Sequence, residues 1–237
     1  DSIARQVREG HGSRLFGRRM ETTALRHDGT EFPVELTVTR VDGAGGAGPL
    51  FYAFVRDITE RRRSEAQLSH LAYHDVLTGL PNRTRVEQEL DRSLARARRA
   101  GSSVALMFVD LDDFKGVNDR FGHAAGDRLL ASVATRLRGA LRDADVIARQ
   151  GGDEFLVLVA DLVDDPVRAA DRVGAKLLDA LCEPFVIAGA EVRTGASIGV
   201  SLYPDDAADT EALMRHADAA MYRAKRDGGG RWALHHR

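Results

Sequence analysis

The stretch VIARQGGDEFLVLV, residues 146–159, decides how the second half of this 237-residue chain folds. Two apolar runs flank the pair Gly151-Gly152. Glycine tolerates the positive φ angles of a tight turn, so two glycines between apolar runs predict a β-hairpin. Asp153 and Glu154 follow the turn, and adjacent carboxylates repel each other unless a positive charge lies beside them. Because Mg²⁺ prefers hard oxygen ligands, a divalent metal is the expected neighbour, although a lone turn of this kind is usually only a turn.

The residues outward from this hairpin predict an α+β domain from residue 75 to residue 237. Helices and strands alternate in the order βα, ββ, αβ, which is typical of the split βαβ, ferredoxin-like arrangement also found in polymerase palms and nucleotidyl cyclases. We expect the helices to pack on one face of the sheet. Besides the hairpin, the expected strands are Val104–Val109, Phe185–Ile187 and Glu191–Tyr203, and the expected helices are Arg85–Ala100, Gly126–Leu141, Val167–Leu181 and Thr210–Lys225.

The composition is that of a soluble globular protein, with 43% hydrophobic and 30% charged residues. A formal net charge of −2 gives no argument for a nucleic-acid partner. No apolar run approaches the ~20 residues of a membrane span, and no signal peptide opens the chain. Cys182 is the only cysteine, which favours a reducing compartment, the cytoplasm. Among 34 basic residues only Lys115, Lys176 and Lys225 are lysines.

Carboxylates and an amide follow the predicted strand FVDLDDFK. Asp110 leaves the sheet beside the hairpin, so it and Asp153 are expected to converge on Mg²⁺, which keeps water and phosphate ligands; the alternative is a strand-end cap. Backbone N–H groups of the next turn, with Lys115, suit phosphates. Asn118 and Asp127 match a guanine edge, with the carboxylate on N1–H and N2–H₂ and the amide on O6, although each alone is more often a cap.

Together FVDLDDFK, the Asn118–Asp127 spacing, RQGGDEF and AMYRAK resemble a GGDEF diguanylate cyclase, over about residues 65–233. The opening DVLTGLPNR is similar as well. The resemblance implies that a homodimer condenses two GTP into cyclic di-GMP and two pyrophosphates, with Mg²⁺ or Mn²⁺. It implies catalytic roles for Asp153, Glu154 and Asp110, metal contacts from Asp110, the Leu111 carbonyl, Asp153 and Glu154, and GTP contacts from Asn118, Asp127, Lys115, Phe114 and Lys225.

The run Arg142-Asp143-Ala144-Asp145 stands five residues before Gly151 and resembles the family's RxxD inhibitory site for product. By itself RxxD is a weak pattern, and its fixed offset before the hairpin is what favours product inhibition. An arginine can bind guanine O6 and N7, and the aspartate can accept from N1–H and N2–H₂. The chain departs from the family at Gln150, usually aromatic or aliphatic, and at Gly229-Gly230, often a basic residue and Asn.

Residues 1–58 predict a small β-rich piece, and residues 59–74 a linker. RHDGTEFPVELTV and FYAFVRDITERR resemble the C-terminal half of a PAS sensor domain, whose front half we expect to be missing. His11 is a poor haem candidate, and the PAS ligand is unknown. The linker lacks Gly and Pro and favours a helix, either a short parallel coiled coil or a solvated connector. The expected elements are a frayed helix Ile3–Val7 and the strands Gly17–Arg26, Glu31–Val41 and Leu50–Arg56.

The family resemblance leaves three alternatives to a PAS-regulated cyclase. The first is a catalytically silent GGDEF domain that binds GTP or cyclic di-GMP. The second is part of a bifunctional protein with an EAL phosphodiesterase domain beyond residue 237, and the third is a pure interaction protein. The sequence does not decide among them, nor does it identify the input signal or the pathway controlled.

Overall fold

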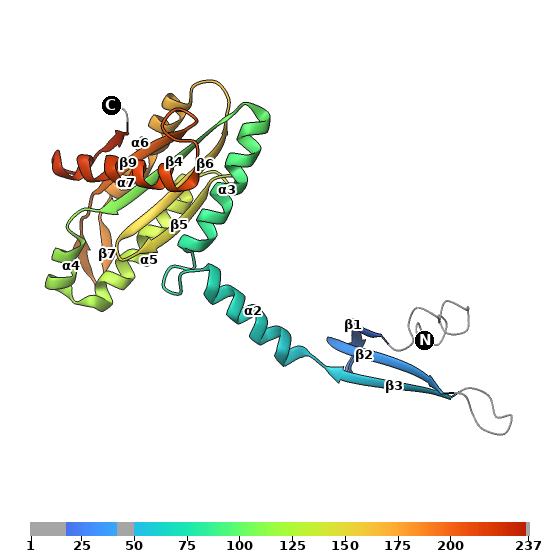
Figure 1. Ribbon diagram of the computed structural model, residues 1–237. Coiled ribbons are helices and arrows are strands. Elements are labelled where there is room, and N and C mark those ends of the chain that lie inside the picture. Colours follow the sequence, from blue (N-terminus) through green and yellow to red (C-terminus); the bar gives the residue numbers. More distant parts are fainter. Residues whose placement is uncertain (1–17, 42–49, 236–237) are drawn as a thin grey trace. The chain divides into compact units, whose positions relative to one another are not determined.

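The computed structural model describes residues 18–41 and 50–235 (Figure 1). The chain divides into two compact units, residues 1–70 and 71–237. The helix expected over Ile3–Val7 and His11 lie outside the described residues. In the described ranges no helix is both long and apolar enough to cross a membrane.

The first unit contains a three-stranded antiparallel sheet in the order β1-β2-β3. Its strands are β1 (Arg19–Leu25), β2 (Glu31–Val41) and β3 (Leu50–Asp57), followed by α2 (Thr59–Tyr73). Asp57 accepts hydrogen bonds from the Thr59 N–H and from Arg26, both at 2.8 Å. Arg61 and Arg62 both donate to Glu21 of β1. The first turn of α2 is therefore tied to the sheet by charged hydrogen bonds.

The second unit is built on a five-stranded sheet in the order β10-β9-β4-β6-β5. The central strand β4 (Ser103–Leu111) pairs antiparallel with β6 (Glu154–Leu162) and with β9 (Ala196–Tyr203). The hairpin partner of β6 is β5 (Val146–Gly151). Helix α5 (His123–Ala140) connects β4 to β5, and α6 (Pro166–Cys182) runs between β6 and β9. This connectivity is the expected split βαβ arrangement.

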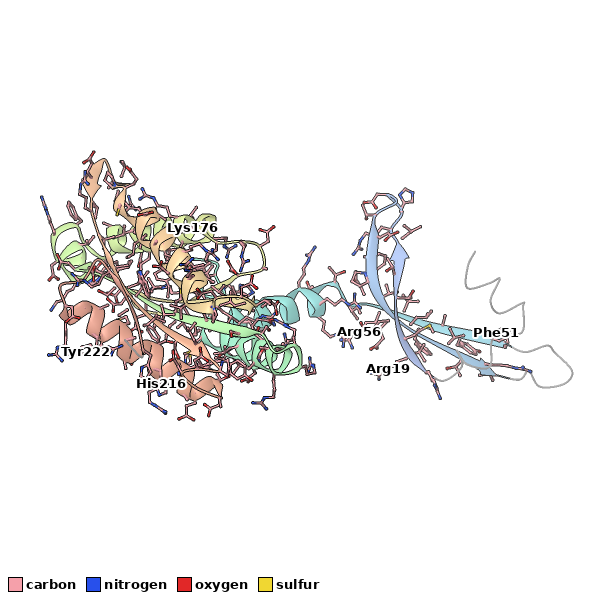
Figure 2. The ribbon with its side chains drawn as sticks, turned by 90° about the horizontal axis from the view of Figure 1, so that it is seen from above. Arg19, Phe51, Arg56, Lys176, His216 and Tyr222 are labelled. Atoms are coloured by element: carbon pink, nitrogen blue, oxygen red, sulfur yellow. The ribbon has the colours of Figure 1, made fainter. Side chains whose placement is uncertain are left out.

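The expectation that the helices pack on one face of the sheet is wrong. The odd-numbered apolar residues of β4 pack in a core with α5 and α6, whereas the even-numbered ones pack with α3 (Arg83–Ala100) and α7 (Thr210–Arg226). Figure 2 shows Lys176, on α6, and His216, on α7, on opposite sides of the sheet. The physical reason lies in the run VALMFV of β4, because a strand that is apolar at every position must be covered on both faces.

Several boundaries also differ from the expectation. Helix α4 (Phe114–Phe121) occupies residues that were expected to form only a turn, and α5 begins before Gly126. The strand expected over Glu191–Tyr203 is divided into β8 (Ala190–Val192), which pairs with β7 (Phe185–Ile187), and β9. The chain leaves the ladder between β8 and β9 because the Thr194 hydroxyl and the Gly195 carbonyl bond to the backbone of Asp112 instead. A short strand, β10 (Trp232–Leu234), was not expected and pairs parallel with β9.

Candidate active site

The end of β4 brings together the acidic residues that the sequence singled out. Asp110 lies inside the strand, opposite Glu154 on β6 and Ser197 on β9. The expected hairpin joins β5 and β6, and Gly152 in its turn has a φ of 53°, which favours glycine. Asp153 follows in the turn, and its carbonyl accepts a hydrogen bond of 3.3 Å from the Leu111 N–H. The hairpin turn is therefore attached to the end of the central strand.

These carboxylates oppose one another's ionisation. Burial raises the pKa of Asp110, a hydrogen bond from Lys225 lowers it, and the charge of Asp153 raises it again, with a net rise. Burial also raises the pKa of Glu154, where a hydrogen bond from Gln150 acts in the opposite direction. A net rise means that the folded site disfavours its full negative charge, so the site favours a bound cation.

Lys225 places a positive charge of the chain itself beside these carboxylates. Its Nζ lies 2.6 Å from Oδ1 of Asp110, whose side chain is only 9% exposed. This hydrogen bond raises the pKa of Lys225, so the ammonium stays protonated. Lys225 therefore touches a proposed metal ligand rather than standing apart from it. Lys115, by contrast, is exposed in the first turn of α4.

The donor chemistry of this site fits Mg²⁺ that arrives with a phosphate. Asp110, Asp153 and Glu154 provide hard carboxylate oxygens at one end of the sheet. Within residues 18–41 and 50–235, no three His, Cys, Asp or Glu side chains form a ready metal-binding group. Mg²⁺ in nucleotide enzymes commonly takes only one or two carboxylates, and phosphate and water oxygens complete its shell. The site matches that pattern better than an all-protein metal cage.

Helices α4 and α5 bring the predicted guanine-binding residues together. A Cβ placed on Gly126 would lie 2.0 Å from Oδ1 of Asn118 and 3.1 Å from the Phe114 ring. The two side chains therefore lie directly against α5, where Asp127 is the next residue and is exposed. Asp127 lies beyond the first turn of α5, so it does not cap the helix and is free to bind a ligand.

Arg149 joins the hairpin to the start of the unit, and neither it nor its partner was predicted as a functional residue. Its guanidinium is 3.0 Å from both carboxylate oxygens of Asp75. The same guanidinium donates to the Gly152 carbonyl at 2.7 and 3.1 Å. Both residues belong to the motifs DVLTGLPNR and RQGGDEF, but 74 residues separate them and no local pattern indicates their contact.

Asp112 was also missed, although it stands within FVDLDDFK. One of its carboxylate oxygens accepts from the Ser197 hydroxyl at 2.7 Å, and the other accepts from the Gly230 N–H at 2.8 Å. Asp112 thereby attaches the glycine-rich segment after α7 to the ends of β4 and β9. Its place directly after the buried strand β4, beside Asp110 and Leu111, was the only available signal.

Arg142 and Asp145 lie away from this site, in a pocket of about 180 Å³ on the α6 side. The Arg142 guanidinium bonds to Asp145 at 3.0 and 3.3 Å, and the Asp145 side chain is only 2% exposed. Arg172 and Lys176 line the same pocket and were not predicted. Figure 2 labels Lys176 on α6. Three basic side chains in one pocket suit an anionic ligand.

A split βαβ sheet with carboxylates at the end of its central strand defines a ferredoxin-like α+β domain with a candidate metal site. The family model described as "Diguanylate cyclase, GGDEF domain" matches residues 72–231. The chain therefore belongs to the GGDEF diguanylate cyclase domain family.

Relatives with known names carry this domain in different contexts. The diguanylate cyclase TpbB of Pseudomonas aeruginosa is 46% identical over 168 residues, which are 70% of this chain and 38% of that protein. The bifunctional diguanylate cyclase/cyclic di-GMP phosphodiesterase MucR of the same species is 45% identical over 170 residues, 72% of this chain and 24% of that protein. The chain thus spans about a quarter to two fifths of the length of these relatives.

Solved structures share the fold. The GGDEF domain of TpbB superimposes with a TM-score of 0.66 and 44% identity, covering 68% of this chain and 94% of that one. The coiled coil and GGDEF domain of DgcB from Caulobacter crescentus, in complex with c-di-GMP, gives a TM-score of 0.66 at 27% identity. That match covers 75% of this chain and 93% of the DgcB chain.

Proposed function

We propose that residues 75–237 form an active diguanylate cyclase that joins two GTP into cyclic di-GMP and releases two pyrophosphates. The observation that carries the proposal is the meeting of Asp110, Glu154 and the Asp153 turn at one end of the sheet. The two named cyclase relatives and the family membership support the same activity. The raised pKa values of Asp110 and Glu154 at one end of the sheet are typical of a functional site.

The guanine base is assigned to the α4–α5 side of the site. The Asp127 carboxylate accepts from guanine N1–H and N2–H₂, and the Asn118 amide binds an acceptor such as O6. Phe114 packs beside Asn118 and limits the space around the base. Lys115, in the first turn of α4, contributes positive charge toward the phosphates.

Asp110, Asp153, Glu154 and the Leu111 carbonyl would hold Mg²⁺ or Mn²⁺ in this proposal. The bound ion would activate the 3′-oxygen and balance the charge of the triphosphate. Lys225 neutralises Asp110 and places a further positive charge at the end of β4. Gln150, where the family usually has an apolar residue, donates a hydrogen bond to Glu154 and orients it.

Each 3′-hydroxyl attacks the α-phosphorus of the other GTP, and pyrophosphate leaves. One domain holds one GTP, so the reaction needs two domains face to face about a twofold axis. We therefore propose a homodimer with two GTP at its interface.

Replacement of Asp153 by alanine tests the activity. The variant removes a proposed metal ligand, so incubation with GTP and Mg²⁺ followed by chromatography should show no cyclic di-GMP. Asp164→Ala is the matched control, because Asp164 is exposed beyond the other end of β6. Product formation by Asp153→Ala at the wild-type rate would contradict the assignment.

The remaining features are assigned to regulation. Residues 1–58 are proposed to be the C-terminal half of a PAS domain, which acts on the cyclase through the helical linker 59–74; its ligand stays unassigned. Arg142 and Asp145 are proposed to bind the product as a feedback inhibitor, which is supported by the DgcB structure that holds c-di-GMP. The cytoplasmic location also stays a prediction.

A bifunctional protein is the second candidate, because MucR combines cyclase and phosphodiesterase activities by name. The GTP assay separates this candidate from a silent binding domain. Transient cyclic di-GMP that is then hydrolysed in the intact protein would support it.

A further inference from the structure

Arg231 lies at the same end of the sheet as Asp110. Its carbonyl accepts a hydrogen bond of 2.9 Å from the Ile198 N–H. Across the next ladder Ile198 pairs with Val109, and Ser197 pairs with Asp110. Neighbouring strands lie about 4.8 Å apart, so two spacings place the Arg231 backbone about 10 Å from the backbone of β4 at Asp110. An arginine side chain can cover much of that distance.

Three consecutive glycines lead the chain from α7 to Arg231. Gly228, Gly229 and Gly230 have φ angles of 108°, 68° and 61°, which side-chain-bearing residues rarely adopt. The Nε of Arg231 donates weakly to the Gly229 carbonyl at 3.4 Å, and a terminal nitrogen would lie 3.9 Å from a Cβ at Gly228. The guanidinium therefore lies over the loop that follows Lys225, where no loop side chain competes for the space.

Asp112 holds this loop in place. It accepts the Gly230 N–H, and a Cβ at Gly229 would lie 3.0 Å from both of its carboxylate oxygens. A side chain at Gly229 would press on this carboxylate and would need a backbone φ of 68° that favours glycine. In this chain the basic side chain of the loop stands two residues after Gly229, at Arg231.

We infer that Arg231 binds the β- and γ-phosphates of GTP, beside Lys225 and across from the guanine side of the site. This inference rests on the proposed function of the domain. Arg231 is exposed, and in the described part of the chain no carboxylate pairs with it. A guanidinium has five N–H donors in a fixed fork that suits phosphate. Among the residues that the structure describes, only its Nε–H makes a bond, which is long at 3.4 Å. Lys225 is engaged by Asp110, which leaves Arg231 as the freer cation.

The test compares the affinities of Arg231→Gln and the unaltered chain for GTP and for GMP, measured by calorimetry with Mg²⁺. We expect a roughly tenfold weaker GTP affinity, about 1.4 kcal/mol, and an unchanged GMP affinity, because GMP lacks the β- and γ-phosphates. Arg231→Lys should recover part of the loss. Equal GTP affinity of Arg231→Gln and the unaltered chain, or equal loss for GTP and GMP, would overturn the inference.

The control is Arg98→Gln, which removes the same charge at the far end of the sheet. Helix α3 ends just before β4 begins, and β4 runs nine residues, about 27 Å, to the site. This variant should bind GTP like the unaltered chain. If the unaltered chain binds GTP but forms no cyclic di-GMP, only the proposed cyclase activity is contradicted. If the unaltered chain does not bind GTP, both proposals are overturned.

Discussion

Gly126 is the residue on which the proposed guanine side of the site depends. It is buried within α5, where glycine costs helix stability relative to alanine. The structure explains its presence, because Oδ1 of Asn118 occupies the place of its Cβ. A glycine in a helix interior is thus a packing requirement of the proposed nucleotide site.

We expect Gly126→Ala to weaken GTP binding by about tenfold or more, since the methyl group must push Asn118 away from the base. Stability should change little, because the gain of about 1 kcal/mol in helix propensity offsets the displacement of the Asn118 side chain. Calorimetric titration with GTP measures the first effect and urea unfolding the second. Gly139→Ala on the same helix is the control, because nothing lies within 4 Å of its Cβ. Unchanged GTP affinity in Gly126→Ala would remove Asn118 from the proposed site.

Arg142 is the better residue for testing product inhibition, because it is largely exposed while the Asp145 side chain is buried. Arg142→Ala removes the guanidinium but keeps the backbone N–H that bonds to Asp145. We expect cyclase rates that no longer fall as cyclic di-GMP is added. Arg99→Ala, at the end of α3, should remain inhibited. Inhibition of both variants to the same degree would refute the site.

At the scale of elements, the ion pair between Asp75 and Arg149 connects the segment before α3 to the hairpin. Burial raises the pKa of Asp75, but hydrogen bonds from Thr78 and Arg149 lower it more, with a net decrease. The folded state therefore holds the ionised form more tightly than the unfolded state does. This contribution to stability is present above pH 4 and is lost as the pH falls through the lowered pKa.

Asp75→Asn should accordingly lower the free energy of unfolding by about 1–3 kcal/mol at pH 7. The difference from the unaltered chain should shrink towards pH 3 and below, because protonation removes the same charge. Urea unfolding at pH 7 and at pH 3 measures this difference in the free energy of unfolding. Asp205→Asn serves as the control, because Asp205 is exposed. A difference that stays constant with pH would mean that the charge of Asp75 does not stabilise the fold.

At the scale of the whole molecule, the proposed reaction needs two domains while each chain supplies one nucleotide site. The cyclase rate per chain should therefore rise with protein concentration until all chains are paired. GTP binding per chain should not change over the same range, which provides the control. A rate per chain that is constant over a hundredfold dilution would argue against dimerisation by mass action.

The sequence alone determined those features of the fold that depend on residues close together in the chain. Two glycines between apolar runs predicted the hairpin, the order of apolar periods predicted the split βαβ connectivity, and the motifs predicted the family. Each of these signals lies within one strand, helix or turn, where local sterics and side-chain periodicity decide the backbone.

Only the tertiary structure decided which distant groups meet. In the folded domain helices cover both faces of the sheet, and β10 pairs with β9. Asp110 bonds to Lys225, Asp112 to Gly230, and Asp75 to Arg149. These pairs depend on strand order and register, which set the positions of residues more than 70 apart in sequence. Local patterns carry no information on those distances, because the sheet forms only when the whole hydrophobic core is buried.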